Sequence, residues 1–69
     1  MNESTIKFAE VLSRKIKERG ITKAELSRMI DVSNTTITNY TKGRVRPHPL
    51  LLQRLAMVFN CRISELYHE

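Results

Sequence analysis

Two short helical segments follow each other with almost no chain between them in the middle of this sequence. Residues 22–30 read TKAELSRMI and residues 34–40 read NTTITNY, and only Asp31, Val32 and Ser33 separate them. A joint this tight between two helices is typical of a helix-turn-helix unit. The spacing therefore predicts a helix-turn-helix, and with it a fold in which helices pack on helices.

The start of the first helix is marked by a capping box. Thr22 is followed three residues later by Glu25, and Ile21 and Leu26 occupy the two positions of a hydrophobic staple. Four residues therefore predict the same boundary. The helical spacing of Leu26 and Ile30 places both side chains toward the core.

The second segment is ambiguous by composition, because its Thr, Ile and Tyr residues favour strands and its Thr and Asn residues are poor helix formers. In a strand Ile37 would share a face with Thr35 and Asn39, so that neither face would be apolar. In a helix Ile37 and Tyr40 lie on one side, and Ser33 caps the start. The pattern favours a helix. Its poor propensity indicates that another demand selected these residues.

Three further helices complete the predicted fold. Residues 3–19 carry apolar side chains at helical spacing, and Gly20 ends that helix. Another begins at Pro49, where the missing N–H costs nothing, and residues 63–67 form a short last one. The first of these helices is expected to bury Ile6, Phe8, Ala9, Val11, Leu12 and Ile16. The sequence thus predicts a single all-α domain over residues 1–69, a compact bundle of five helices.

Positive charge is concentrated in the second half of the chain. The sequence has 12 Lys and Arg against 7 Asp and Glu, a net charge of +5. Residues 32–62 hold no acidic residue, and their basic residues are Lys42, Arg44, Arg46, Arg54 and Arg62. Such a field attracts polyanions such as nucleic acid. The alternative is a basic protein that its charge keeps in solution.

Other function classes find little support. Cys61 is the only cysteine, so no internal disulfide can form, and a reducing cytoplasm is expected. Cys61 itself is expected to be a small hydrophobic residue of the core. His48 and His68 have no Cys or acidic partner at ligand spacing, so we expect no metal and no cofactor. No apolar run is long enough to span a membrane. No serine has a histidine near it in a catalytic motif, so we expect no enzyme.

The pattern of residues resembles the phage repressor and Cro helix-turn-helix family, also called the xenobiotic-response-element type. The resemblance covers residues 8–67 without an insertion, and it implies a lambda-repressor-like bundle. The matching residues are TKAEL at 22–26, IDVSN at 30–34, Ile37, Gly43, Arg46-Pro47, and Leu55-Ala56 on to Ile63. The family places its third helix in the major groove, usually as a dimer on a two-fold symmetric operator.

The chain departs from the family at four positions. Lys23 stands where Gln is usual, which keeps a phosphate contact but loses an amide bridge to the recognition helix. Asp31 replaces the usual turn Gly and adopts the left-handed conformation less easily. Ile16 and Thr41 stand where many members pair Arg with Glu, so an apolar contact is expected instead of an ion pair.

The outward face of the predicted recognition helix carries hydrogen-bonding side chains. At about 100° per residue, the positions opposite Ile37 and Tyr40 are filled by polar residues. The expected base contacts are Thr35, Thr38 and Asn39 on this side and Asn34 at the exposed tip of the helix. An Asn amide can bond adenine at N6 and N7, and a Thr methyl can pack on the thymine methyl, which favours A·T steps. The alternative is that these residues are merely solvated.

Phosphate contacts are expected on both sides of that helix. The candidates are Thr22, Lys23, Lys42, Arg44 and Arg46. A solvated basic loop is the alternative for the last three. If these roles are right, Asn39→Ala relaxes specificity, whereas Arg44→Ala weakens binding to all sequences alike and lowers the salt slope by about one.

The leading hypothesis is a sequence-specific regulator of transcription, a repressor, that binds double-stranded DNA with an inverted-repeat operator. It would act as a homodimer through its last two helices, with Val58, Arg62 and Tyr67 as candidate contacts. One alternative is the N-terminal DNA-binding domain of a longer phage-type repressor. Another is a protein-interaction module such as an antitoxin or adaptor, which would favour exposed apolar residues over this polar helix and basic loop.

Overall fold

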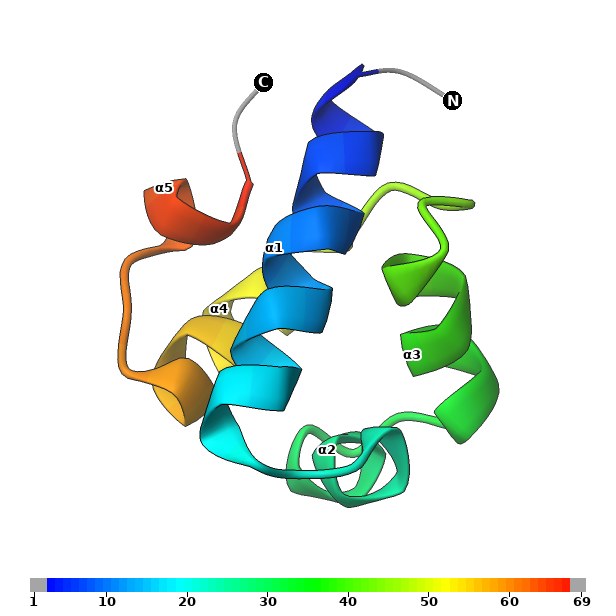
Figure 1. Cartoon of the computed structure of the whole chain (residues 1–69), viewed down its shortest axis with the longest axis vertical. Coiled ribbons are helices and arrows are strands. Elements are labelled where there is room, and N and C mark those ends of the chain that lie inside the picture. Colours follow the sequence, from blue (N-terminus) through cyan, green and yellow to red (C-terminus); the bar gives the residue numbers. More distant parts are fainter. Residues whose placement is uncertain (1–2, 68–69) are drawn as a thin grey trace.

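The computed structural model describes residues 3–67, which form five helices and no strand (Figure 1). The helices are α1 (Glu3–Arg19), α2 (Lys23–Met29), α3 (Asn34–Thr41), α4 (Pro49–Phe59) and α5 (Ile63–Leu66). The predicted all-α, five-helix fold is therefore confirmed. His68 lies outside the described residues.

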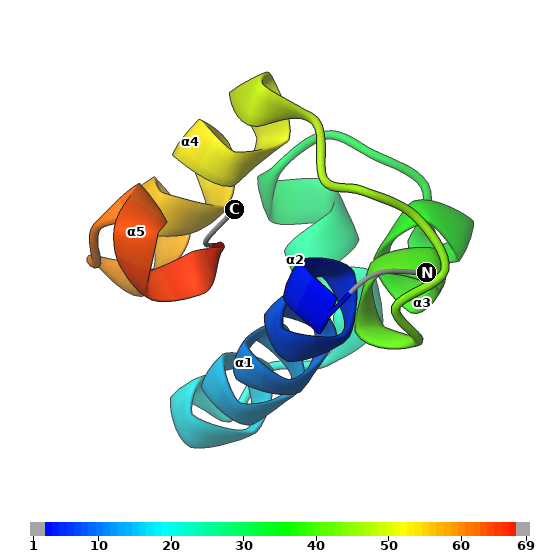
Figure 2. The ribbon, with the colours of Figure 1, turned by 90° about the horizontal axis from the view of Figure 1, so that it is seen from above.

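The long helix α1 lies in the centre, with α3 on one side and α4 and α5 on the other (Figure 1). The helix α2 crosses below α1 and contacts α3, and the view along the molecule from above shows the same separation of α3 from α5 (Figure 2). The helix-turn-helix therefore occupies one side of the domain, and its second helix is held from behind by α1.

The core receives side chains from all five helices. The fully buried large side chains are Phe8, Leu12, Leu26, Ile30, Ile37, Leu55 and Leu66. The ring of Phe8 packs edge-on against Tyr40, with ring centroids 5.7 Å apart, and against Tyr67, at 6.0 Å. One aromatic ring of α1 thus joins α3 to the residue that follows α5.

The prediction for the first turns of α1 was wrong at one position. Ile6 is 47% exposed, whereas Thr5 is only 4% exposed. The buried side of α1 runs through residues 5, 8, 9, 12 and 16, which keep helical spacing, and position 6 falls outside that stripe. The helical position of each residue, and not its hydrophobicity, therefore decides that Thr5 is buried and Ile6 exposed. Val11 lies at the edge of the stripe and packs against the core.

The predicted capping box of α2 is confirmed. The Thr22 hydroxyl accepts a hydrogen bond from the Glu25 N–H at 3.0 Å, and the Glu25 carboxylate accepts one from the Thr22 N–H at 3.0 Å. The turn that follows α2 contains Asp31 at φ 59°, the left-handed conformation that Gly adopts most easily. The helix-turn-helix therefore keeps its turn geometry with Asp in place of Gly.

Candidate nucleic-acid interface

Helix α3 is held at its start and along its inner side. The Ser33 hydroxyl accepts a hydrogen bond from the Thr36 N–H at 3.2 Å, which confirms Ser33 as the N-cap. Ile37 is fully buried and Tyr40 is 4% exposed. These are the only two core residues of α3, so a cap and two anchors fix a helix of weak intrinsic propensity.

The end of α3 is closed by a Schellman motif. The Gly43 N–H donates to the Tyr40 carbonyl at 3.2 Å, and the Arg44 N–H donates to the Asn39 carbonyl at 3.0 Å. Gly43 has φ 67° and is buried, and an added Cβ would lie 3.6 Å from the Cβ of Ala9. The chain therefore leaves α3 along one fixed path against α1, as the predicted stop at Gly43 requires.

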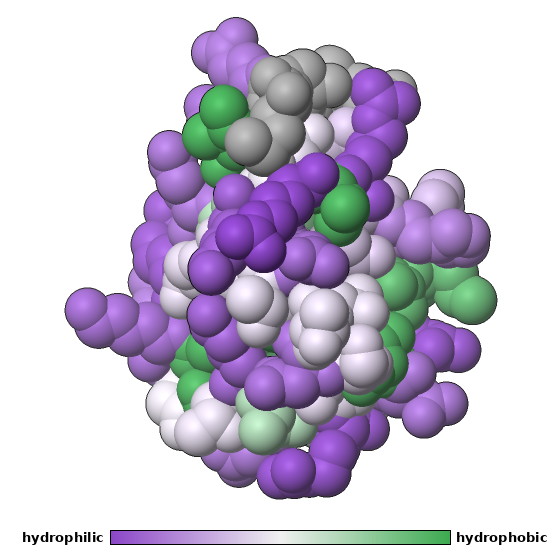
Figure 3. Space-filling view, turned by 90° about the vertical axis from the view of Figure 1, so that its right-hand side faces the viewer, coloured by the Kyte–Doolittle hydropathy of each residue, from purple (hydrophilic) through white to green (hydrophobic). Residues whose placement is uncertain are grey.

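Of the four predicted base contacts, Thr35, Thr38 and Asn39 fall on the side of α3 opposite its two anchors, and Asn34 is the first residue of the helix. Asn34 and Thr35 are exposed, and Thr38 and Asn39 are half-buried. Figure 3 shows the side of the molecule on which α3 lies: residues of intermediate hydropathy occupy the middle, and strongly hydrophilic side chains lie around them, with hydrophobic patches between. The four residues offer short hydroxyl and amide groups for hydrogen bonding.

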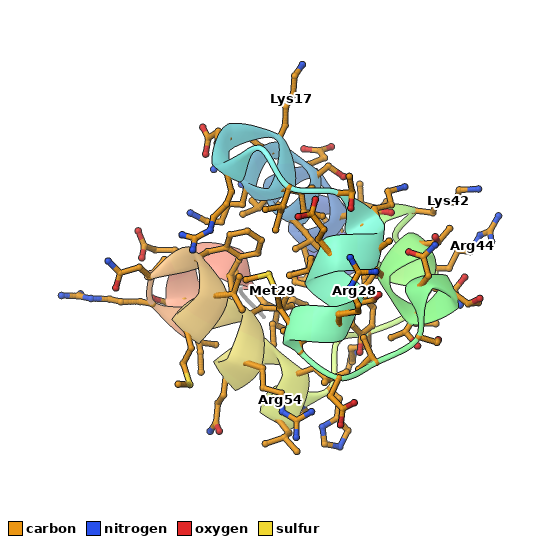
Figure 4. The ribbon with its side chains drawn as sticks, turned by 90° about the horizontal axis from the view of Figure 1, so that it is seen from below. Lys17, Arg28, Met29, Lys42, Arg44 and Arg54 are labelled. Atoms are coloured by element: carbon orange, nitrogen blue, oxygen red, sulfur yellow. The ribbon has the colours of Figure 1, made fainter. Side chains whose placement is uncertain are left out.

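The predicted phosphate contacts lie exposed around this face. Lys42 and Arg44 extend from the end of α3 away from the core (Figure 4), and Arg46 is exposed farther along the same loop. Thr22 and Lys23 are exposed at the start of α2. Four of these five exposed residues are cations, and the fifth, Thr22, is the N-cap of α2.

One basic residue of the 32–62 segment has a different task. The Arg54 guanidinium on α4 donates from Nη1 to the carbonyl of Ile30, at the end of α2, at 2.9 Å. A cation is favoured there, because the last carbonyls of a helix lack internal partners and carry partial negative charge. Arg54 therefore joins α4 to the helix-turn-helix. The 24-residue separation hid this contact from sequence reasoning.

Tyr40 belongs to the core, as its spacing with Ile37 predicted. Its hydroxyl accepts a hydrogen bond from the His48 N–H at 3.5 Å, so it serves the chain's own backbone just before α4. His48 in turn caps α4, because its Nδ1 accepts from the Leu50 N–H at 3.1 Å. The predicted start of the helix at Pro49 already placed His48 at the cap position, although His is not among the residues preferred there.

The positions of the family's usual ion pair hold uncharged groups. Ile16 is 8% exposed and belongs to the core cluster. The Thr41 hydroxyl donates to the Thr38 carbonyl at 3.0 Å, one turn back in the same helix. Ile16 therefore packs in the core, as its helical spacing predicted, and Thr41 satisfies its own polar group.

A second surface lies on α4, where Met57 is 81% exposed between two shallow grooves. One groove, of about 420 Å³, is lined by Met29, Ile30, Asp31, Arg54, Met57 and Val58. The other, of about 500 Å³, is lined by Ala56, Met57, Asn60, Cys61, Arg62 and Glu65. Cys61 is half-buried and packs against the core, whereas Tyr67 turns its ring inward against Phe8.

Two further features bear on function class. No helix in residues 3–67 is both long and apolar enough to cross a membrane. Over the same stretch, no three His, Cys, Asp or Glu side chains come together as a metal ion would need.

Comparisons with known proteins agree with this geometry. A helix-turn-helix family model of the Cro/C1 type matches residues 12–66. The chain is 38% identical over 48 residues to an uncharacterized HTH-type transcriptional regulator of Archaeoglobus fulgidus, covering 70% of this chain and 69% of that protein. The fold of this chain is similar to the solution structure of the SOS-response transcriptional repressor LexA from Eubacterium rectale. The TM-score is 0.92 at 29% identity, over 99% of this chain and 72% of that one.

Proposed function

This chain belongs to the helix-turn-helix family, and from that premise we propose that it is a sequence-specific regulator of transcription, a repressor, that binds double-stranded DNA. One observation carries the proposal. Helix α3 presents a polar face of Asn and Thr side chains on a backbone fixed by two buried anchors and by caps at both ends. A surface that only needed to be soluble would not require poor helix formers at these positions.

In the proposed complex α3 enters the major groove. Asn34, Thr35, Thr38 and Asn39 meet base edges, because their hydroxyl, amide and methyl groups match the donor, acceptor and methyl pattern displayed there. The phosphate contacts come from the exposed residues on either side, which are Thr22, Lys23, Lys42, Arg44 and Arg46. These contacts fix the register of the helix on the duplex, and the base contacts supply specificity.

The regulator is proposed to act as a homodimer on an inverted repeat, through the Met57 surface. Met57 is 81% exposed, and each adjoining groove carries one acidic and one basic residue. A second copy related by a two-fold axis presents the same surface in reverse, so it can place Met57 in a groove and opposite charges against each other. The lone Cys61 fits a reducing cytoplasm, and the proposed activity is non-enzymatic.

The dimer is tested by sedimentation velocity and by binding to an inverted repeat and to an isolated half-site. Met57→Glu is expected to shift the protein to monomer and to weaken binding to the repeat but not to the half-site. Leu50→Glu is the matched control, because Leu50 is 49% exposed on the same helix but lines neither groove. Equal effects of the two variants would remove the case for this surface.

The function itself is tested by selection from random duplex DNA at near-physiological salt. The wild-type chain is compared with a variant in which Asn34 and Asn39 are both Ala. We expect an enriched inverted repeat with half-sites about one helical turn apart, lost in the variant. Salt-sensitive binding without enrichment would point to a missing dimerisation part, and no binding at all would favour a protein-interaction module.

A further inference from the structure

We propose that Arg44 is a positioning residue for base recognition: it holds the Asn39 carboxamide by its oxygen, so that Asn39 offers its Nδ2 hydrogens to the DNA. The proposal rests on the proposed function. It adds to the phosphate contact of Arg44 a role in specificity that works through another side chain.

The backbone already places residue 44 beside residue 39. In the Schellman motif the Arg44 N–H donates to the Asn39 carbonyl at 3.0 Å. Gly43, at φ 67°, makes the reversal, and the Cα of Ile6 and the Cβ of Ala9 on α1 close off the space behind it. Because α1 supports this turn, Arg44 starts from a fixed point close to Asn39.

The side chains then make a second contact between the same two residues. Arg44 Nη1 donates to Asn39 Oδ1 at 3.5 Å. A guanidinium has five donors and no acceptor, so it can face only the oxygen of the amide. The bond is long and therefore weak, but Asn39 is half-buried and its backbone is fixed, so a small bias decides which amide atom points outward.

This orientation determines what Asn39 can recognise. An unrestrained Asn pairs with adenine by donating to N7 and accepting from N6, which requires both amide atoms. With Oδ1 turned toward Arg44, the outward atoms are the Nδ2 donors, which match the two acceptors of guanine, N7 and O6. At the base pair that Asn39 reads, the chain should therefore prefer guanine to adenine.

The two tasks of Arg44 are chemically separable. A phosphate contact requires charge, whereas holding Oδ1 requires only a donor of suitable length. Arg44→Gln loses the charge and keeps an N–H donor, two bonds closer to the backbone than Nη1, and Arg44→Met loses both charge and donor at the length of Gln. Arg46→Met is the matched control, because Arg46 is exposed in the same loop and no hydrogen bond joins its side chain to the described part of α3.

Asn39→Ala first identifies the base pair that Asn39 reads, as the one at which this variant loses discrimination. The experiment then measures affinity for the selected operator and for the same operator with adenine in place of guanine at that base pair. The guanine-to-adenine ratio is the ratio of these two affinities. Arg44→Met should lower the guanine-to-adenine ratio by about threefold or more, a coupling within the usual range for side chains in contact. Arg44→Gln should lose as much overall affinity as Arg44→Met but lose less of the ratio, because its shorter side chain still carries a donor. Arg46→Met should lower affinity and leave the ratio unchanged.

Adding Arg44→Met to Asn39→Ala should leave the ratio as it is in Asn39→Ala alone, because the positioned amide is already gone. Equal thermal unfolding midpoints for the Met and Gln variants confirm that the fold is intact. An unchanged ratio in Arg44→Met, or a wild-type preference for adenine, would overturn the positioning role and leave the proposed function standing. If the wild-type chain enriches no sequence, the proposed function itself fails.

Discussion

Helices α3 and α4 lie on opposite sides of α1 and are stabilised in different ways (Figure 1). The sequence of α3, NTTITNYT, contains no strong helix former and contributes two buried side chains. The sequence of α4, PLLLQRLAMVF, is rich in good helix formers, buries Leu52, Leu55 and Ala56, and still exposes Met57. The polar helix α3 is therefore stabilised mainly by its packing against other helices. The apolar helix α4 buries enough hydrophobic surface to stay folded and still leaves Met57 exposed.

The largest expected loss of stability comes from replacing one apolar side chain, and the same replacement is made in each helix for comparison. Ile37→Ala is expected to lower the free energy of unfolding by about 2–5 kcal/mol, because the side chain is fully buried. Met57→Ala should change it by less than about 0.5 kcal/mol in the monomer. Urea denaturation at low protein concentration measures both.

If Ile37→Ala leaves no folded protein, the milder Ile37→Val supplies the value, with an expected loss of about 0.5–1.5 kcal/mol. Losses of equal size at positions 37 and 57 would show that α3 does not depend on its anchors more than α4 does.

The end of α3 gives the next effect. Gly43→Ala is expected to cost about 1–2 kcal/mol, because a Cβ is unfavourable at φ 67°. Gly43→Asn should cost less, since Asn adopts the left-handed conformation more readily, as Asn60 does at the end of α4 with φ 51°. Thermal unfolding of the two variants measures the loss of stability. Equal losses would mean that contact of the new side chain with α1, and not the backbone conformation, causes the destabilisation.

The start of α3 gives a smaller effect. Ser33→Ala removes the hydroxyl that accepts from the Thr36 N–H and should cost about 1 kcal/mol. Ser33→Thr retains a capping hydroxyl and should lie within a few tenths of a kcal/mol of the wild type. Hydrogen exchange of the first amides of α3 reports the loss locally. Unchanged protection in Ser33→Ala would show that the anchors alone hold this end.

The smallest effect concerns the link between α3 and the loop before α4. Tyr40→Phe leaves the ring in place but removes the acceptor of the His48 N–H, a bond of 3.5 Å. We expect a loss of about 0.5 kcal/mol, at the low end for one hydrogen bond, by chemical denaturation. A loss above about 2 kcal/mol would mean that the hydroxyl supports more of the loop than this single bond.

Local sequence signals predicted most of the fold. The capping box at Thr22, the cap at Ser33 and the stop at Gly43 each depend on residues within a few positions, and the structure confirms all three. The predicted helix over residues 34–41 is also confirmed, because only a helix puts Ile37 and Tyr40 on the same buried side. Such contacts are encoded by residue type and spacing alone.

Contacts between distant segments could not be predicted in the same way. Nothing near Arg54 in the sequence indicates that it reaches the Ile30 carbonyl, and the sequence shows it only as part of the basic segment at residues 32–62. The exposure of Ile6 depends on how α1 is rotated against α3. The base and phosphate contacts remain predictions, because their test requires DNA.

The bond between Arg54 and Ile30 has a geometric consequence for a dimer. It fastens the turn of the helix-turn-helix to α4, and Met57 lies one helical turn farther along that same helix. In a dimer assembled on Met57, each recognition helix would be tied through Arg54 to the symmetry axis. Arg54, which is not among the proposed DNA contacts, would then help to set which spacing of half-sites the protein accepts.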